Sequence, residues 1–98
     1  MRYIYYTAVE FEYDQAKSIG NQAKHGLDFE QAKALWSDPN RVEFMARFSD
    51  ETRLGLVAQV DRKLWTAIFT TRGDRIRLIS VRRARKNEEG IYNDRTGI

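Results

Sequence analysis

Arginine residues are concentrated in one short stretch in the C-terminal third of the sequence. Its basic residues are Arg72, Arg75, Arg77, Arg82, Arg83, Arg85 and Lys86, and the only acidic residue among them is Asp74. A guanidinium group is a planar fork of donors that binds phosphate oxygens in pairs and keeps its charge beside other cations. The stretch therefore predicts a binding site for a polyanion, with RNA or DNA as the first candidates.

Two simpler interpretations of this stretch stay open. Arginines that alternate with Ile and Leu also occur on the solvated face of a strand, and they also dock acidic protein partners. The whole chain carries 17 basic and 14 acidic residues, a formal charge of +3. The signal is therefore the local concentration of positive charge and not the overall charge.

A second group of candidate residues is the run Lys24-His25-Gly26. His25 is the only histidine of the chain, and an imidazole ordinarily titrates near pH ~6.5, so it is the simplest acid or base available. Lys24 can hold a phosphate, or act as a base where neighbouring cations lower its pKa. The alternative is structural, because basic residues before a glycine stabilise the C-terminal end of a helix.

RNA cleavage itself is implied only by the family resemblance described below; without a metal it requires a base for the 2′-OH, an acid for the leaving oxygen, and cations around the transition state. Among the arginines, Arg72 and Arg77 are the best candidates for these cations, and Arg82 is the third. Thr70 and Ser80 are expected to face each other across a hairpin and to position a phosphate oxygen. Arg75 and Arg83 are expected to add RNA-binding charge.

Other residue types exclude further chemistry. The chain has no cysteine, so a thiol nucleophile and a cysteine zinc site are excluded. Glu10, Glu12 and Asp14 alternate as Mg²⁺ ligands would, but Asp14 is better explained as a helix N-cap, so we expect no metal and no cofactor. Trp36 and Trp65 are expected in the core and not as stacking platforms for bases.

The elements that must position these residues form one domain over residues 1–98. A strand is predicted over Ile4–Phe11, followed by a helix that Asp14 begins and Gly26 ends, with Ala16, Ile19 and Ala23 at helical spacing. A second helix follows a capping box of Asp28 and Gln31 and ends before Pro39. Its expected core face is Phe29, Ala32, Leu35 and Trp36.

Beyond Asn40 the hydrophobic period changes from helical to two. Strands are predicted over residues 42–48, 54–60, 64–71 and 75–81, joined by short polar turns at 49–52, 61–63 and 73–74. A helix over Arg82–Tyr92, with Ala84, Glu88 and Tyr92 four residues apart, closes the chain. The predicted fold class is α+β: strand, two helices, a four-stranded antiparallel meander and a C-terminal helix, with the helices packed on the sheet. The sequence shows no signal peptide and no membrane-spanning apolar run, so a cytoplasmic location is expected.

Two sets of motifs together resemble the BrnT toxin family over about residues 9–92. The N-terminal set is Phe11-Glu12-Tyr13-Asp14, Lys17, Asn21, Lys24-His25-Gly26-Leu27-Asp28-Phe29, Ala32 and Asp38-Pro39. The C-terminal set is Thr70-Thr71-Arg72-Gly73, Ile76-Arg77-Leu78-Ile79-Ser80, Arg82-Arg83-Ala84, Glu88 and Tyr92. The chain departs from the family's common pattern at Tyr13, Gln15 and Val81.

The resemblance implies a bacterial ribonuclease toxin of a type II toxin-antitoxin system, with a RelE-like fold, that cleaves RNA and arrests growth. It also implies a BrnA-like ribbon-helix-helix antitoxin as partner, with operator DNA bound only through that antitoxin. Fold likeness does not assign catalytic roles. Two alternatives therefore remain: a basic module that binds RNA or antitoxin without cutting, and a protein whose arginines serve only an acidic partner.

Overall fold

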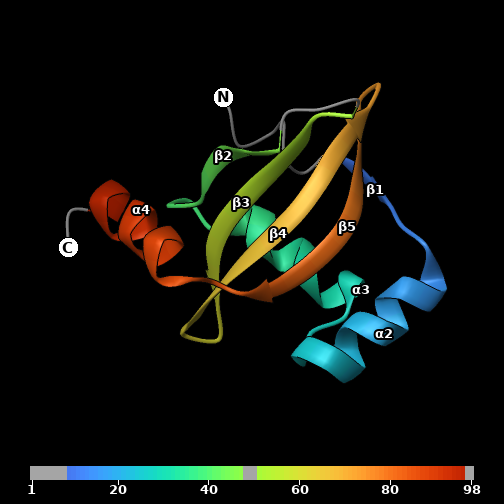
Figure 1. Ribbon diagram of the computed structural model, residues 1–98, viewed down its shortest axis with the longest axis horizontal. Coiled ribbons are helices and arrows are strands. Elements are labelled where there is room, and N and C mark those ends of the chain that lie inside the picture. Colours follow the sequence, from blue (N-terminus) through green and yellow to red (C-terminus); the bar gives the residue numbers. More distant parts are fainter. Residues whose placement is uncertain (1–8, 48–50, 97–98) are drawn as a thin grey trace.

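The computed structural model describes residues 9–47 and 51–96. The elements, in chain order, are β1 (Glu10–Glu12), α2 (Gln15–His25), α3 (Phe29–Ala32), the 3₁₀ helix η1 (Lys33–Ser37), β2 (Val42–Arg47), β3 (Arg53–Val60), β4 (Lys63–Arg72), β5 (Arg75–Arg83) and α4 (Lys86–Thr96). One five-stranded sheet has the order β1-β5-β4-β3-β2 (Figure 1). The predicted α+β class and the antiparallel meander are confirmed.

The first strand joins the sheet by parallel pairing, whereas the strands of the meander pair antiparallel. β1 pairs in parallel with β5, with Glu10 opposite Arg75 and Glu12 opposite Arg77, so the sheet is mixed. Most of the strand predicted over Ile4–Phe11 lies outside the described residues. The parallel pairing joins the first and the last strand and therefore brings acidic residues from one end of the sequence to arginines at the other.

The two ends of α2 and the start of α3 are those that the sequence predicted. The Asp14 carboxylate accepts hydrogen bonds from the backbone N–H groups of Ala16 (2.8 Å) and Lys17 (3.2 Å). Gly26 ends α2 with a φ of 90°, which only glycine adopts without strain. At α3, the backbone N–H of Gln31 donates to Asp28 and that of Asp28 donates to the Gln31 side chain, so the capping box is confirmed.

The buried face of α2 is polar, although Ala16, Ile19 and Ala23 stand at helical spacing. Ala16 and Ala23 are exposed, and Ile19 is 63% exposed. The buried residues are Ser18 and Asn21. They replace apolar contacts with hydrogen bonds to backbone: the Ser18 hydroxyl accepts from the N–H of Phe29 at 2.9 Å.

The Asn21 side chain links α2 to the edge of β5 by hydrogen bonds. Its amide nitrogen donates to the carbonyls of Leu27 (2.6 Å) and Val81 (2.8 Å), and its oxygen accepts from the N–H of Val81 (3.1 Å). β1 pairs with β5 only over Arg75–Arg77. A side-chain amide thus satisfies backbone groups farther along the same edge, which would otherwise be buried without hydrogen bonds.

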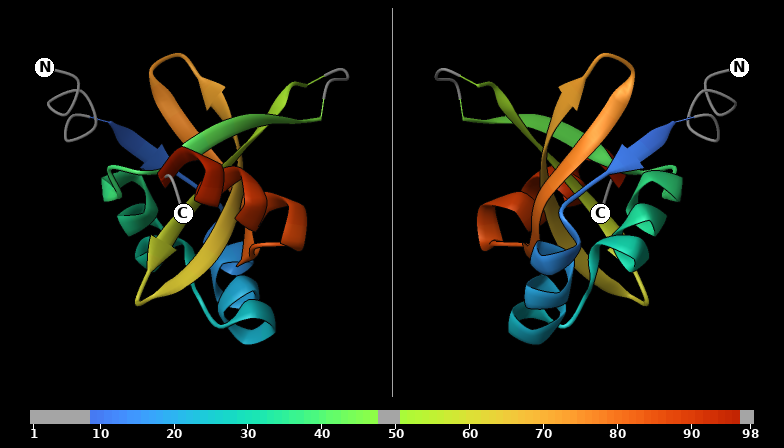
Figure 2. Two further views of the ribbon diagram at one scale, coloured as in Figure 1. Left: turned by 90° about the vertical axis from the view of Figure 1, so that its left-hand side faces the viewer. Right: turned by 90° about the vertical axis from the view of Figure 1, so that its right-hand side faces the viewer.

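The hydrophobic core lies between the sheet and the helices α3 and η1. Phe29, Ala32, Leu35 and Trp36 are all buried there, as predicted, although the second helix changes from α to 3₁₀ geometry at Lys33. Trp36 and Trp65 both belong to this core. α4 packs on the other face of the sheet, against β2 and β3 (Figure 2).

The C-terminal helix begins later than the sequence predicted. β5 extends through Arg83, with Arg82 opposite Thr66 and Arg83 opposite Trp65, and α4 starts at Lys86. The prediction of a helix from Arg82 was wrong because pairing with β4 keeps these residues extended. Glu88 and Tyr92 are buried as the four-residue spacing implied. No helix of the described ranges is long and apolar enough to cross a membrane.

Candidate nucleic-acid interface

The pairing of β4 with β5 contains a bulge that decides which side chains share a face. Ile68 lies opposite Ser80 and Phe69 lies opposite Leu78, so Ile79 is an extra residue in β5. Directly paired residues point to the same side of a sheet. We call the face that carries Thr66, Ile68 and Thr70 of β4 the outer face, and the core lies on the opposite, inner face.

The bulge brings the main arginine candidates to the outer face. Arg77 lies opposite Thr70 and Arg82 lies opposite Thr66. Strict alternation along β5 would have placed Arg77 and Arg82 on opposite faces, because they are an odd number of residues apart. The extra residue reverses the alternation, which is a common role of bulges beside functional sites.

Ser80 shares this face, but it does not face Thr70 as the sequence analysis expected. Thr70 lies opposite Arg77, and Ser80 lies opposite Ile68. The Thr70 hydroxyl donates to the carbonyl of Thr52 at 2.9 Å, which joins the start of β3 to β4. Thr70 is therefore a buried link between strands, and Ser80 is the more accessible of the two hydroxyls.

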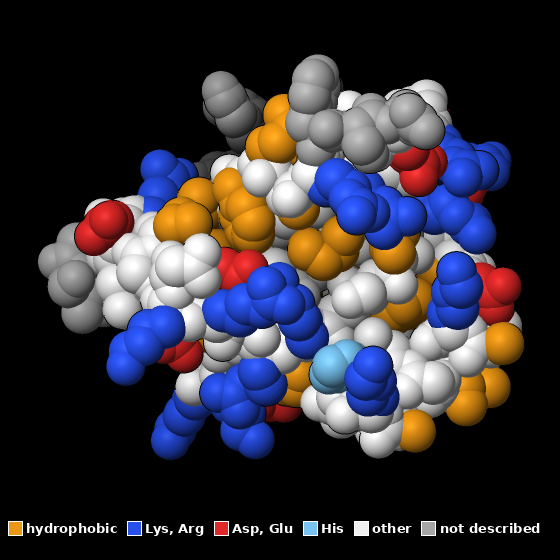
Figure 3. Space-filling model, viewed as in Figure 1, with side chains coloured by type: hydrophobic (Ala, Val, Ile, Leu, Met, Phe, Trp, Pro, Cys, Tyr) orange, Lys and Arg blue, Asp and Glu red, His pale blue; other side chains and the backbone are white. Residues whose placement is uncertain are grey.

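The outer face consists of rows that run across the strands. The basic row is Glu12, Arg77, Thr70, Arg53 and Arg47; Arg53 continues the β3–β4 register opposite Thr70 and pairs with Arg47 on β2. The apolar row is Ser80, Ile68, Gly55 and Phe44. The third row, Arg82, Thr66, Val57 and Val42, lies toward α4, where Glu88 bonds to Thr66. Figure 3 looks onto this face and shows apolar side chains bordered by Lys and Arg.

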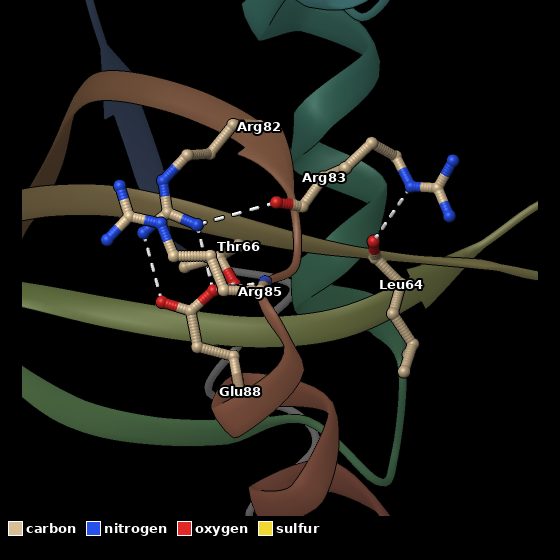
Figure 4. Close-up of polar contacts among 6 residues, drawn as sticks. All are labelled: Leu64, Thr66, Arg82, Arg83, Arg85 and Glu88. Carbon is tan, nitrogen blue, oxygen red and sulfur yellow. Dashed lines mark hydrogen bonds and ion pairs between the residues drawn. The ribbon is translucent and has the colours of Figure 1, made fainter.

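Arg82 is held by a buried carboxylate of α4. Its guanidinium nitrogens donate to the two oxygens of Glu88 at 2.8 and 2.9 Å, and the same carboxylate accepts from the Thr66 hydroxyl and the backbone N–H of Arg85 (Figure 4). Burial alone would raise the pKa of Glu88, but the hydrogen bonds from Arg82, Arg85 and Thr66 outweigh it and lower the pKa to about 2. Arg82 is therefore fixed in direction by a carboxylate of α4.

Three more arginines of the hairpin, Arg72, Arg75 and Arg77, lie near carboxylates from other parts of the sequence. Arg77 bonds to Glu12 at 3.3 Å, and Arg75 lies 3.3 Å from Glu10 and 3.7 Å from Glu12. At the hairpin tip, Arg72 lies 3.7 Å from Glu51. The sequence showed only Asp74 opposing this cluster, whereas the fold adds glutamates from β1, α4 and the turn before β3.

Arg83 is not brought together with these residues. It lies opposite Trp65 on the inner side, with its guanidinium carbon 5.6 Å from the centre of the indole ring. Its Nε donates to the carbonyl of Leu64 at 3.3 Å. Because of the bulge, Arg77 and Arg82 point to the outer face, and Arg83, the residue after Arg82, points to the inner face.

Lys24 and His25 form the last turn of α2. They lie three and four residues after Asn21, so they share the side of the helix that faces β5. His25 is half-buried and Lys24 is exposed. Figure 3 shows the histidine on the view of the outer face, next to a basic side chain. This position suits proton transfer at an RNA held on the sheet, and it equally suits capping of the helix.

Several residues of this face were missed by the sequence analysis. Arg53 and Phe44 lie in its basic and apolar rows, and Glu12 and Glu88 hold its arginines. The period-two pattern of β3 could have placed Arg53 on the face opposite Leu54. The partner carboxylates had no local signal, since Glu12 lies 65 positions before Arg77.

The acidic residues near the interface have structural partners. Asp14 is the N-cap of α2, and Glu10 and Glu12 lie against arginines of β5. Over residues 9–47 and 51–96, no three or more His, Cys, Asp or Glu side chains form a group that could hold a metal ion.

The outer face of this α+β domain carries arginines of β2, β3 and β5 beside α4, which is the pattern expected of a polyanion-binding surface. Comparison with known families matches residues 13–88 to the family described as ribonuclease toxin, BrnT, of type II toxin-antitoxin system. The chain belongs to this family, and its type of system implies an RNA substrate and an antitoxin partner. A search of the curated proteins finds no match.

Proposed function

We propose that the chain is a metal-independent endoribonuclease toxin that binds RNA on the outer face of the sheet. The observation that carries the proposal is the bulge at Ile79, which places Arg77, Ser80 and Arg82 on one face. The Glu12 and Glu88 carboxylates fix the directions of the two arginines before RNA binds. Donors that are fixed in advance stabilise the charge that develops on the phosphate in the transition state.

Proton transfer is assigned to the end of α2. His25 serves as acid or base, and Lys24 binds the phosphate or takes the second proton step. Arg72 and Arg75 at the hairpin tip add phosphate contacts at the rim. Arg83 is left out of the catalytic assembly because it lies against Trp65 on the inner side.

The direct test is expression of the chain alone in a bacterium, with new RNA 5′ ends mapped across total RNA, followed by cleavage by the purified protein in EDTA. Growth arrest, new ends and cleavage that persists in EDTA are expected. Activity that disappears in EDTA and returns with Mg²⁺ contradicts the metal-free mechanism. Tight RNA binding without fragments at any salt or pH would identify a binding module instead of an enzyme.

Single-turnover cleavage by variants assigns the roles. Arg77→Ala is expected to slow cleavage about 10²-fold or more, as loss of one preorganised donor does. His25→Ala is expected to slow it about 10²–10⁴-fold if His25 transfers a proton. Arg83→Ala is the matched control, because it removes the same group from the same strand but from the opposite face. Normal cleavage by His25→Ala with stability lowered by ~1 kcal/mol or less would leave His25 with the capping role alone.

We further propose that the antitoxin is a BrnA-like ribbon-helix-helix protein and that it covers the arginines of the β4–β5 hairpin. A neutral or acidic segment over Arg72, Arg77 and Arg82 would block RNA and neutralise neighbouring positive charges together. In this scheme operator DNA is bound by the antitoxin and not by this chain. A structure of the complex in which these arginines remain open to solvent would contradict occlusion.

A further inference from the structure

A partly exposed aromatic ring lies in the apolar row of the outer face. Phe44 on β2 is directly opposite Gly55 on β3. A Cβ atom at Gly55 would come within 2.7 Å of the ring carbons Cε1 and Cε2 of Phe44, so the ring lies over the glycine backbone. A side chain at this position would displace the ring, so glycine lets the ring lie directly on the sheet.

Arginine borders this apolar row on both sides. Arg53 and Arg77 belong to the basic row on one side, and Arg82 belongs to the row on the other. Ile68, half-buried, lies beside Gly55 in the centre of the apolar row. Figure 3 shows the resulting surface, in which apolar side chains lie between groups of Lys and Arg.

From this arrangement we infer that Phe44 is a stacking platform for an unpaired base of single-stranded RNA, while Arg53 and Arg77 contact the flanking phosphates. The inference rests on the proposed function and deepens it, because it names the form of RNA that the face takes. In a single strand, planar apolar bases alternate with anionic phosphates, and the rows of this face alternate in the same way. A duplex would keep its bases stacked inside and leave the ring without a ligand.

The test measures binding apart from cleavage. The probe is a short oligoribonucleotide with 2′-O-methyl sugars, which lack the 2′-OH needed for strand scission. Phe44→Leu keeps an apolar cover over Gly55 and removes the ring, and it is expected to weaken binding about 5–150-fold, as loss of one base-stacking contact does. Phe44→Trp is expected to retain the affinity. Met45→Leu is the matched control, since Met45 is the next residue, is 57% exposed and lies on the other face, opposite Leu54.

A second probe separates the base from the phosphates. An oligonucleotide of equal length with abasic sugars is expected to bind wild-type protein more weakly than the first probe, and this difference is expected to vanish in Phe44→Leu. The salt dependence of binding is expected to stay the same in Phe44→Leu, because no phosphate contact is lost. Thermal unfolding of each variant identifies any loss of affinity that comes from misfolding.

Two outcomes would overturn the inference: equal affinity of wild type and Phe44→Leu for the first probe, or equal affinity of wild type for both probes. Either result would leave the apolar row as a contact for a protein partner. Cleavage of ordinary RNA, measured on the same proteins, is an independent result. A chain that discriminates the probes but never cleaves would refute the proposed function and not this platform.

Discussion

Arg77 and Arg82 share a face, but they differ in how much the fold depends on them. Arg82 is only 19% exposed and neutralises a carboxylate that is 6% exposed, whereas Arg77 and its partner Glu12 are 32% and 25% exposed. Removing one partner of a buried ion pair leaves an uncompensated charge, and exposed pairs contribute little. The two arginines are therefore expected to differ in their contribution to stability.

Arg82→Ala is expected to lower the free energy of unfolding by about 3–5 kcal/mol, because Glu88 would remain buried without its cation. Arg77→Ala is expected to lower it by ~1 kcal/mol or less. Urea unfolding at neutral pH measures both. Equal losses in the two variants would contradict the different roles inferred from their burial.

The Glu88 carboxylate also predicts a pH dependence. Its pKa is lowered to about 2 in the folded chain, from an ordinary value of 4.5. A lowered pKa means that the unfolded chain takes up the proton first as the pH falls, so stability is complete above pH 4.5 and is lost between there and about 2. Glu88→Gln is expected to lower stability at pH 7 and to flatten this part of the profile. Parallel profiles of wild type and Glu88→Gln between those pH values would show that another group causes the acid transition.

At the scale of elements, α2 is attached to β5 by hydrogen bonds and not by an apolar face. Asn21→Asp keeps the shape but places a carboxylate against the carbonyls of Leu27 and Val81, to which the amide now donates. We expect a loss of about 2–4 kcal/mol in the free energy of unfolding and faster hydrogen exchange at the Val81 amide. Gln22→Ala, at the exposed neighbouring position, is the control, with an expected change within about 0.5 kcal/mol. Equal stability of Asn21→Asp and wild type would show that the Asn21 hydrogen bonds do not hold α2 on β5.

The features that the sequence predicted well are the helix ends that depend on residues close by in the sequence. The Asp14 cap, the Asp28–Gln31 box and the stop at Gly26 depend on contacts within a few positions. The helical spacing of Ala16, Ile19 and Ala23 did not indicate the buried side of α2, because Ser18 and Asn21 form hydrogen bonds with distant backbone groups, which periodicity does not report. The helix predicted from Arg82 failed for the same reason, since pairing with Thr66 decides its conformation.

The candidate site was predicted in its residue types but not in its arrangement. The density of arginine in the sequence alone predicted a surface that binds a polyanion. Which arginines share a face depends on the single extra residue Ile79, and a bulge has no mark in an alternating sequence. The glutamates that hold Arg77 and Arg82 come from β1 and α4, so only the tertiary fold reveals them.

At the scale of the whole molecule, the net charge is only +3, but the arginines concentrated on the outer face predict a binding strength that depends strongly on salt. The logarithm of the affinity for single-stranded RNA is expected to fall with the logarithm of salt concentration with a slope of ~0.7 per neutralised phosphate. Arg77→Ala is expected to reduce this slope by about one such step, and Arg83→Ala to leave it unchanged. A titration series at several salt concentrations measures the slopes, and an equal reduction in both variants would place RNA on both faces.

The order of synthesis sets when the pairs of Arg77 with Glu12 and of Arg82 with Glu88 can form. Glu12 is synthesised early, but its partner Arg77 lies 65 positions later. Arg82 is synthesised before its partner, Glu88 of α4. A ribosome adds residues in order, and a contact cannot form before its second residue exists. The basic row is therefore incomplete through most of translation, and the nascent toxin acquires its two oriented arginines only as the last strand and helix emerge.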